Sequence, residues 1–84
     1  MDITEELSDA THRYLRGEIA LAALADTSDR HVLALPSLAP SSLASRLIGA
    51  IEHGLAELDN GAITETDIKQ DLQSELAPAL APAD

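Results

Sequence analysis

Residues 55–76, LAELDNGAITETDIKQDLQSEL, hold the most informative turn of the chain and decide the fold. Asn60-Gly61 marks the end of one helix, because glycine, and less often asparagine, accepts the left-handed conformation that commonly follows a last helical turn. Thr64 then lies where an N-cap belongs, and Asp67 occupies the position at which a capping box normally carries Glu or Gln. The stretch therefore predicts two helices joined by a tight turn.

Two further signals surround the same turn. Ile63 and Ile68 have the spacing of a hydrophobic staple, in which a residue before the cap packs on one in the first helical turn. Glu65 and Asp67 place negative charge at the positive end of the helix dipole. Both signals agree with a helix that begins directly after Thr64.

The turn also resembles the second half of a calcium loop of the EF-hand or dockerin type. In such a loop the first and third ligand positions would fall on Ala56 and Leu58, which have no side-chain oxygen. Asn60, one carbonyl and Asp67 remain, whereas calcium takes about six to eight oxygen ligands. The sequence therefore predicts a plain helix–turn–helix with no metal site.

Hydrophobic spacing predicts three to four helices, and no strand pattern is present. The first expected helix follows a cap at Asp2 or Thr4 and runs to about Arg16, and a second helical segment spans residues 18–35. The longest helix follows a cap at Ser41 or Ser42 and reaches about Asp59, and the last runs from Glu65 to about Ala77. Residues 18–35 fit either one helix or two, because Thr27-Ser28 interrupts the apolar pattern before Pro36 ends it. We therefore predict an all-α fold, a small bundle of three to four helices in a single domain of residues 1–76, with residues 77–84 as a disordered Ala/Pro tail.

The expected core is aliphatic, since Tyr14 is the only aromatic residue among 84. The residues predicted to face it recur at helical spacing: Ile3, Leu7, Ala10, Thr11 and Tyr14, then Leu43, Ala44, Leu47, Ile48, Ile51, Leu55 and Leu58, then Ile68, Leu72 and Leu76. The third segment has the widest stripe and is expected at the centre, touching two neighbours, with the last helix at the edge. A core without Phe or Trp predicts marginal stability for the monomer, which a partner or a second copy would supplement.

Charge restricts the partners. The chain has 15 acidic and 5 basic residues and a net charge of −10, which opposes binding to nucleic acid or to an anionic membrane. Residues 52–75 are the most acidic part, with Glu52, Glu57, Asp59, Glu65, Asp67, Asp71 and Glu75 against Lys69. An acidic surface of this kind serves either solubility or the attraction of a basic partner.

Several function classes find no support in the sequence. There is no cysteine, the N-terminus is acidic where a signal peptide would be basic, and no apolar run approaches the roughly 18 residues of a membrane span. His12, His31 and His53 are far apart and lack a metal-ligand spacing, so we expect surface histidines, with a weak pair between His53 and Glu57. No serine lies in a nucleophile motif and no glycine loop could hold a phosphate. We expect a cytoplasmic protein that is not an enzyme and binds no cofactor or metal.

A family resemblance rests on two groups of residues. They are RYLRGEI at residues 13–19 with Leu21 and Leu24, and Ile51-Glu52 with LAEL at residues 55–58, Gly61 and Thr64-Glu65. This pattern resembles a group of small bacterial helical proteins, some of which are similar to the colicin-D-type immunity proteins, acidic helical bundles that block a basic nuclease. The chain lacks the aromatic residue often found after the second helix in that group, which leaves the packing of residues 26–35 open.

The resemblance and the charge together imply a non-catalytic, acidic protein-binding module, an inhibitor of the immunity or antitoxin type that occludes a basic partner protein. The expected partner-binding residues are Glu57, Asp59, Glu65, Asp71 and Glu75. One alternative is a structural or oligomerisation module, a homodimer that pairs through its Leu/Ile helix stripes. Another is a phage-encoded inhibitor of a host nucleic-acid enzyme, which would use the same acidic surface, and a third is an enzyme subunit or regulatory adaptor.

Overall fold

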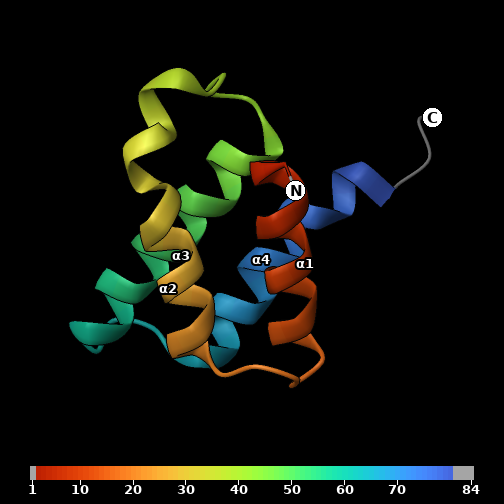
Figure 1. Cartoon of the computed structure of the whole chain (residues 1–84). Coiled ribbons are helices and arrows are strands. Elements are labelled where there is room, and N and C mark those ends of the chain that lie inside the picture. The colour runs from red at the N-terminus through yellow and green to blue at the C-terminus, as the bar shows by residue number, and fades with distance from the viewer. Residues whose placement is uncertain (1, 81–84) are drawn as a thin grey trace.

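The fold is an all-α bundle of four α-helices and one short 3-10 helix, here in a computed structural model that describes residues 2–80, with side chains to residue 76 (Figure 1). The elements are α1 (Ile3–Leu15), α2 (Leu21–His31), the 3-10 helix η1 (Val32–Ser37), α3 (Leu43–Asp59) and α4 (Glu65–Leu80). Residues 2–80 contain no strand. The predicted fold class is confirmed.

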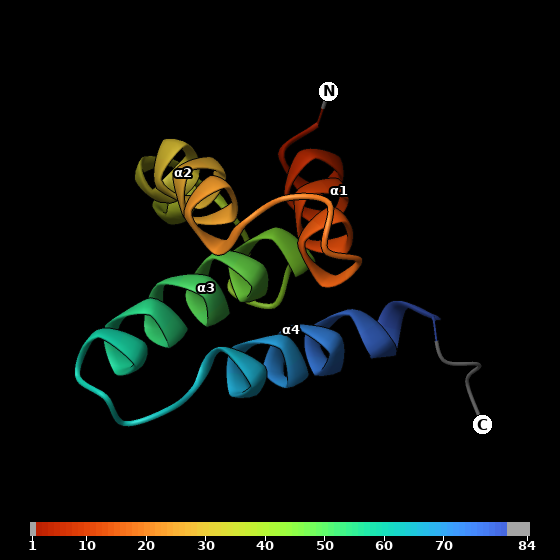
Figure 2. The same ribbon diagram turned by 90° about the horizontal axis from the view of Figure 1, so that it is seen from below.

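Helix α3 is the centre of the bundle, because it packs against α1, α2 and α4 (Figure 2). Leu47, Ile48 and Ile51 of α3 are completely buried. The prediction of a central helix is confirmed, although α3 touches three neighbours where the stripe predicted two. A helix that is apolar on more than one side must bury each of those sides against another element.

Helix α4 lies at the edge of the bundle, as its narrow stripe predicted. Its buried side chains are Ile68, Leu72 and Leu76, and it packs on α3 and α1. The helix continues to Leu80 and not to about Ala77, so the first part of the expected tail has a helical backbone. Residues 81–84, the rest of the expected tail, lie outside the described residues.

The second helical segment is continuous, with α2 passing directly into η1. Thr27 and Ser28 do not break it, because Thr27 Oγ1 donates to the carbonyl of Ala23 at 3.2 Å and Ser28 Oγ donates to Glu52 Oε2 at 2.8 Å. Both hydroxyls therefore have partners within the helical conformation. Helix α2 begins at Leu21, later than the expected residue 18.

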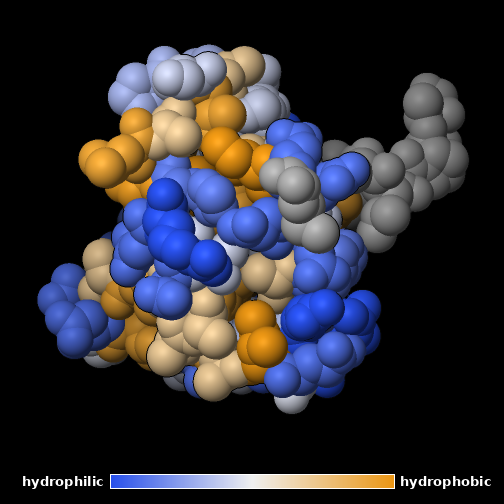
Figure 3. All heavy atoms as spheres, viewed as in Figure 1, coloured by the Kyte–Doolittle hydropathy of each residue, from blue (hydrophilic) through white to orange (hydrophobic). Residues whose placement is uncertain are grey.

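Pro36 was expected to end this segment, yet it lies inside η1, which ends one residue later at Ser37. The tighter 3-10 turns give this part of the chain a period of about three residues. Figure 3 shows hydrophobic residues gathered on the surface over η1.

The turn between α3 and α4 has the geometry that the sequence predicted. Gly61 has φ 74°, and the amides of Gly61 and Ala62 donate to the carbonyls of Leu58 and Glu57 at 3.0 and 2.9 Å, which closes a Schellman motif. The Thr64 amide donates to Asp67 Oδ2 at 2.9 Å and the Asp67 amide to Thr64 Oγ1 at 3.4 Å. This reciprocal capping box confirms the predicted start of α4.

Two glycines of α3 generate a prediction, because their surroundings differ. A Cβ at Gly49 would meet nothing within 4 Å, whereas a Cβ at Gly54 would lie 3.1 Å from Cγ1 of Ile68. We expect Gly49→Ala to raise the free energy of unfolding by about 0.5–1 kcal/mol through helix propensity. Gly54→Ala should leave the free energy of unfolding about unchanged or lower it, because the new methyl group forces Ile68 to shift and this offsets the gain in helix propensity.

Urea denaturation followed by circular dichroism at 222 nm measures both variants, and Gly49→Ala is the matched control for Gly54→Ala. Equal stabilisation by the two substitutions would show that α3 and α4 are not in close contact at Gly54.

Candidate protein-binding surface

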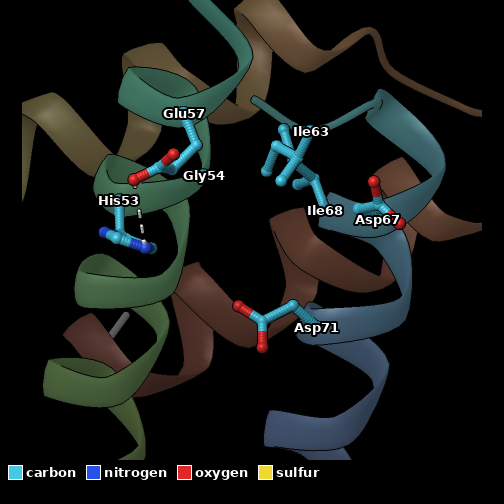
Figure 4. A pocket seen from close by; sticks show the side chains of 7 residues that line it. All are labelled: His53, Gly54, Glu57, Ile63, Asp67, Ile68 and Asp71. Carbon is cyan, nitrogen blue, oxygen red and sulfur yellow. Dashed lines mark ion pairs between the residues drawn. The ribbon is translucent and has the colours of Figure 1, made fainter. Parts of the chain in front are cut away.

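A groove runs between α3 and α4 beside their connecting turn (Figure 4). Its volume is about 440 Å³, and its lining consists of His53, Gly54, Glu57, Ile63, Asp67, Ile68 and Asp71. Three kinds of group therefore meet here: carboxylates, aliphatic side chains and one imidazole. The groove occupies the most acidic part of the sequence.

The floor of the groove is apolar. Ile68 is 2% exposed and lies against Gly54, where the missing side chain lets α4 approach α3 closely. Ile63, from the turn, is half-buried and points toward Ile68 (Figure 4). The two isoleucines that the sequence predicted as a staple thus line the floor of the groove.

The rim of the groove is acidic. Asp71 is exposed and has no ion-pair or hydrogen-bond partner among the side chains that the structure describes. Glu57 Oε1 lies 3.8 Å from Nε2 of His53, whose side chain is 73% exposed, so the predicted weak pair is confirmed. Asp67 caps α4 through Thr64, yet its side chain also borders the groove. The rim therefore has three carboxylates, those of Glu57, Asp67 and Asp71, and one imidazole.

The five acids expected to bind a partner do not form one set. Glu57 and Asp71 line the groove, and Asp59 is exposed at the last residue of α3. Glu65 accepts a hydrogen bond of 2.6 Å from the Tyr14 hydroxyl, and Glu75 lies 3.1 Å from Nε of Arg46. Two of the five therefore make contacts within the bundle.

Tyr14 of α1 contacts α4 through its hydroxyl and through its aromatic ring. Its ring is 2% exposed, Glu65 accepts from its hydroxyl, and Lys69 Nζ lies 5.4 Å from the ring centroid. Burial and then the hydrogen bond to Glu65 raise the pKa of Tyr14 well above its usual range. The only lysine of the chain is thus placed over the only aromatic ring, away from any role in neutralising the groove.

His31 differs from the predicted surface histidines. Its side chain is 20% exposed, and its Nε2 bonds with the carboxylate of Glu6 across the α1–α2 contact. This hydrogen bond is the main cause that lowers the pKa of Glu6. Because the two residues are 25 positions apart, no local pattern could have paired them.

A carboxyl pair lies between α2 and α3. Burial raises the pKa of Glu52, the hydrogen bond from Ser28 acts in the opposite direction, and the neighbouring carboxyl of Asp29 raises it again. Ser28 itself is completely buried. The pair connects helices inside the fold and lies apart from the groove.

A second hollow, of about 390 Å³, lies between α1 and α2 and has side chains of both charges. Asp9 Oδ2 lies 3.1 Å from Nε of Arg13, one helical turn away, and Arg30 donates to Thr27 at 3.2 Å. Its lining has three acidic residues and two arginines, so this hollow does not present one sign of charge to a ligand. The α3–α4 groove is the better candidate for a binding surface.

Metal sites and membrane-spanning helices are two further features that a chain of this kind could have. No three His, Asp or Glu side chains of the described residues lie where they could hold a metal ion together. None of the helices that the structure describes is both long enough and apolar enough to cross a membrane.

Comparison of the chain with protein-family models, with curated proteins and with solved structures found no match. The resemblance to the colicin-D-type immunity proteins therefore stays a prediction.

The carboxyl pair gives a prediction about pH. A raised pKa means that ionised Glu52 is less favourable in the folded than in the unfolded chain, and this cost disappears as the pH falls through the folded pKa toward the ordinary value of 4.5. At pH 7, Glu52→Gln removes the charge, keeps an acceptor for Ser28 and adds a donor for Asp29. We expect it to stabilise the fold by about 0.5 kcal/mol, discounted for partial exposure, which corresponds to about 2–4 °C in Tm.

Thermal unfolding by circular dichroism at pH 7 and below pH 4 checks this, with Glu5→Gln on the exposed face of α1 as the control. The gain from Glu52→Gln should be present at pH 7 and absent at the lower pH. A loss of stability at pH 7 would contradict the prediction.

Proposed function

We propose that this protein is a non-catalytic binding module that docks a basic partner protein on the α3–α4 groove and so blocks the partner's own cationic surface, as an inhibitor of the immunity or antitoxin type would. The observation that carries the proposal is the groove itself, in which an aliphatic floor lies beneath a rim of carboxylates that includes the exposed Asp71.

The two parts of the groove match the two parts of a lysine or arginine side chain. Such side chains bury their aliphatic stems on apolar surface and keep the charged head at a polar edge. Ile63, which is half-buried beside the buried Ile68, supplies that apolar surface, and Glu57 and Asp71 supply acceptors on opposite sides of it (Figure 4). Charge-assisted hydrogen bonds to carboxylates are among the stronger polar contacts in proteins.

The charge of the whole chain supports the same partner class. A net charge of −10 attracts a basic protein from a distance and raises its association rate, most strongly at low salt. The same charge repels phosphate backbones and anionic lipids. Asp59, exposed at the end of α3, adds to this long-range attraction.

Of the expected partner-binding residues, Glu57 and Asp71 are proposed to contact the partner directly, and Asp67, which the sequence indicated only as a cap, joins them. Glu65 and Glu75 are proposed to add to the negative electrostatic potential without touching the partner, because their carboxylates already bond with Tyr14 and Arg46. Reversing the charge of Glu75 would also place two cations together, so Asp71 is the cleaner position to test.

The test uses the tagged protein to capture basic proteins from a lysate of the source cells, followed by calorimetry with the captured partner. We expect Asp71→Lys to weaken the affinity about tenfold, or about 1.4 kcal/mol, and to flatten the dependence of Kd on salt. The matched control is Glu5→Lys, which makes the same change in net charge on the exposed face of α1.

Glu5→Lys should change Kd by less than about twofold at 150 mM salt, since exposed charges farther than about one Debye length of 8 Å are screened. Unchanged affinity in Asp71→Lys, or an equal loss in both variants, would show that the groove is not the docking surface.

A further inference from the structure

The segment that contains η1 differs from the rest of the chain because it has no charged side chain. Residues 32–45 contain no Asp, Glu, Lys, Arg or His, in a chain whose net charge is −10. Leu33, within η1, is 92% exposed, and no other large hydrophobic side chain among those described is exposed in this way. Figure 3 shows hydrophobic residues gathered here. This uncharged surface, centred on Leu33 and Pro36, is called the η1 face below.

The 3-10 geometry explains why Leu33 points outward. With about three residues per turn, positions separated by three lie one above the other. Val32 and Leu35 follow this spacing and are half-buried against the core, whereas Leu33 and Pro36 follow it on the exposed side. Leu33 and Pro36 therefore form an apolar ridge on the exposed side of η1. Burying an exposed leucine side chain is worth about 1.5–3 kcal/mol.

We propose that the η1 face is the contact between two copies of this chain in a weak, symmetric dimer. A two-fold axis places the same patch on both sides of an interface, so each copy's Leu33 would pack on the uncharged face of the other. Two acidic chains that met elsewhere on the surface would bring carboxylates together, whereas here they meet without facing charges.

A second copy fits this face better than the basic partner does. A basic partner gains nothing from a surface without charge, and the η1 face and the α3–α4 turn lie at opposite ends of the molecule (Figure 1). The wide Leu/Ile stripes that were predicted to pair two copies lie inside the bundle instead. Their members Leu47, Ile48, Ile51 and Leu72 are fully buried. The η1 face, by contrast, holds Leu33, the large hydrophobic side chain that is most exposed among the described residues. The inference does not rest on the proposed function, because no residue of the groove takes part.

Sedimentation velocity of the whole chain between 10 μM and 1 mM, in 50 and 500 mM NaCl, tests the proposal. The face is small, so we expect a Kd on the order of 100 μM. We also expect Kd to fall several-fold at the higher salt, because screening weakens the repulsion between two chains of net charge −10. A complex of this acidic chain with a basic partner has the opposite salt dependence.

Leu33→Glu should raise the dimer Kd at least tenfold, and it should not disturb the fold, because the side chain is almost fully exposed. Ala22→Glu is the matched control: it adds the same charge at an exposed position of α2 and should change Kd by less than about twofold. Asp71→Lys should leave the dimer intact, which separates this test from that of the groove.

Two results would overturn the inference. One is a chain that stays monomeric to 1 mM in 500 mM NaCl, which would leave the η1 face to a different protein. The other is a dimer whose Kd is the same in Leu33→Glu as in the unchanged protein, which would place the contact on another surface.

Discussion

The close approach of α3 and α4 at Gly54 is the contact on which the rest of the structure depends. Because Gly54 has no side chain, Ile68 fills the space beside it, and the turn with its two caps fixes the helices at that separation. The same separation sets the depth of the groove and the spacing of the carboxylates on its two sides. Packing at one glycine thus determines what the surface above it can bind.

Features with a local cause could be predicted from the sequence. The turn at Gly61, the capping box of Thr64 and the buried stripe of α4 follow from residues only a few positions apart. Contacts across the bundle could not: Ser28 with Glu52 and Tyr14 with Glu65 join residues 24 and 51 positions apart. Helical spacing says which residues share a face, but not which helix that face meets. The 3-10 conformation of residues 32–37 could not be predicted either, because Pro36 indicates the end of an α-helix but lies here within a 3-10 helix.

The candidate site shows the same division. Glu57 and Asp71 were predicted as an acidic surface, and both line the groove, whereas Glu65 and Glu75 are held by partners from α1 and α3. Asp67 has two roles that one position in the sequence cannot separate, because the residue that caps α4 also borders the groove. The sequence therefore predicted the sign of the surface well and its shape poorly, since shape depends on how the two helices lie against each other.

The position of Tyr14 has a consequence for observing this molecule. It is the chain's single fluorophore, as there is no tryptophan, and it is enclosed at the junction of α1 and α4 between a carboxylate and an ammonium group. Its emission therefore reports on one interface and not on an average over many, without any added label. Separation of α1 from α4 would be visible optically even while the α3–α4 hairpin stays folded, so the order in which the bundle opens is accessible from its own spectrum.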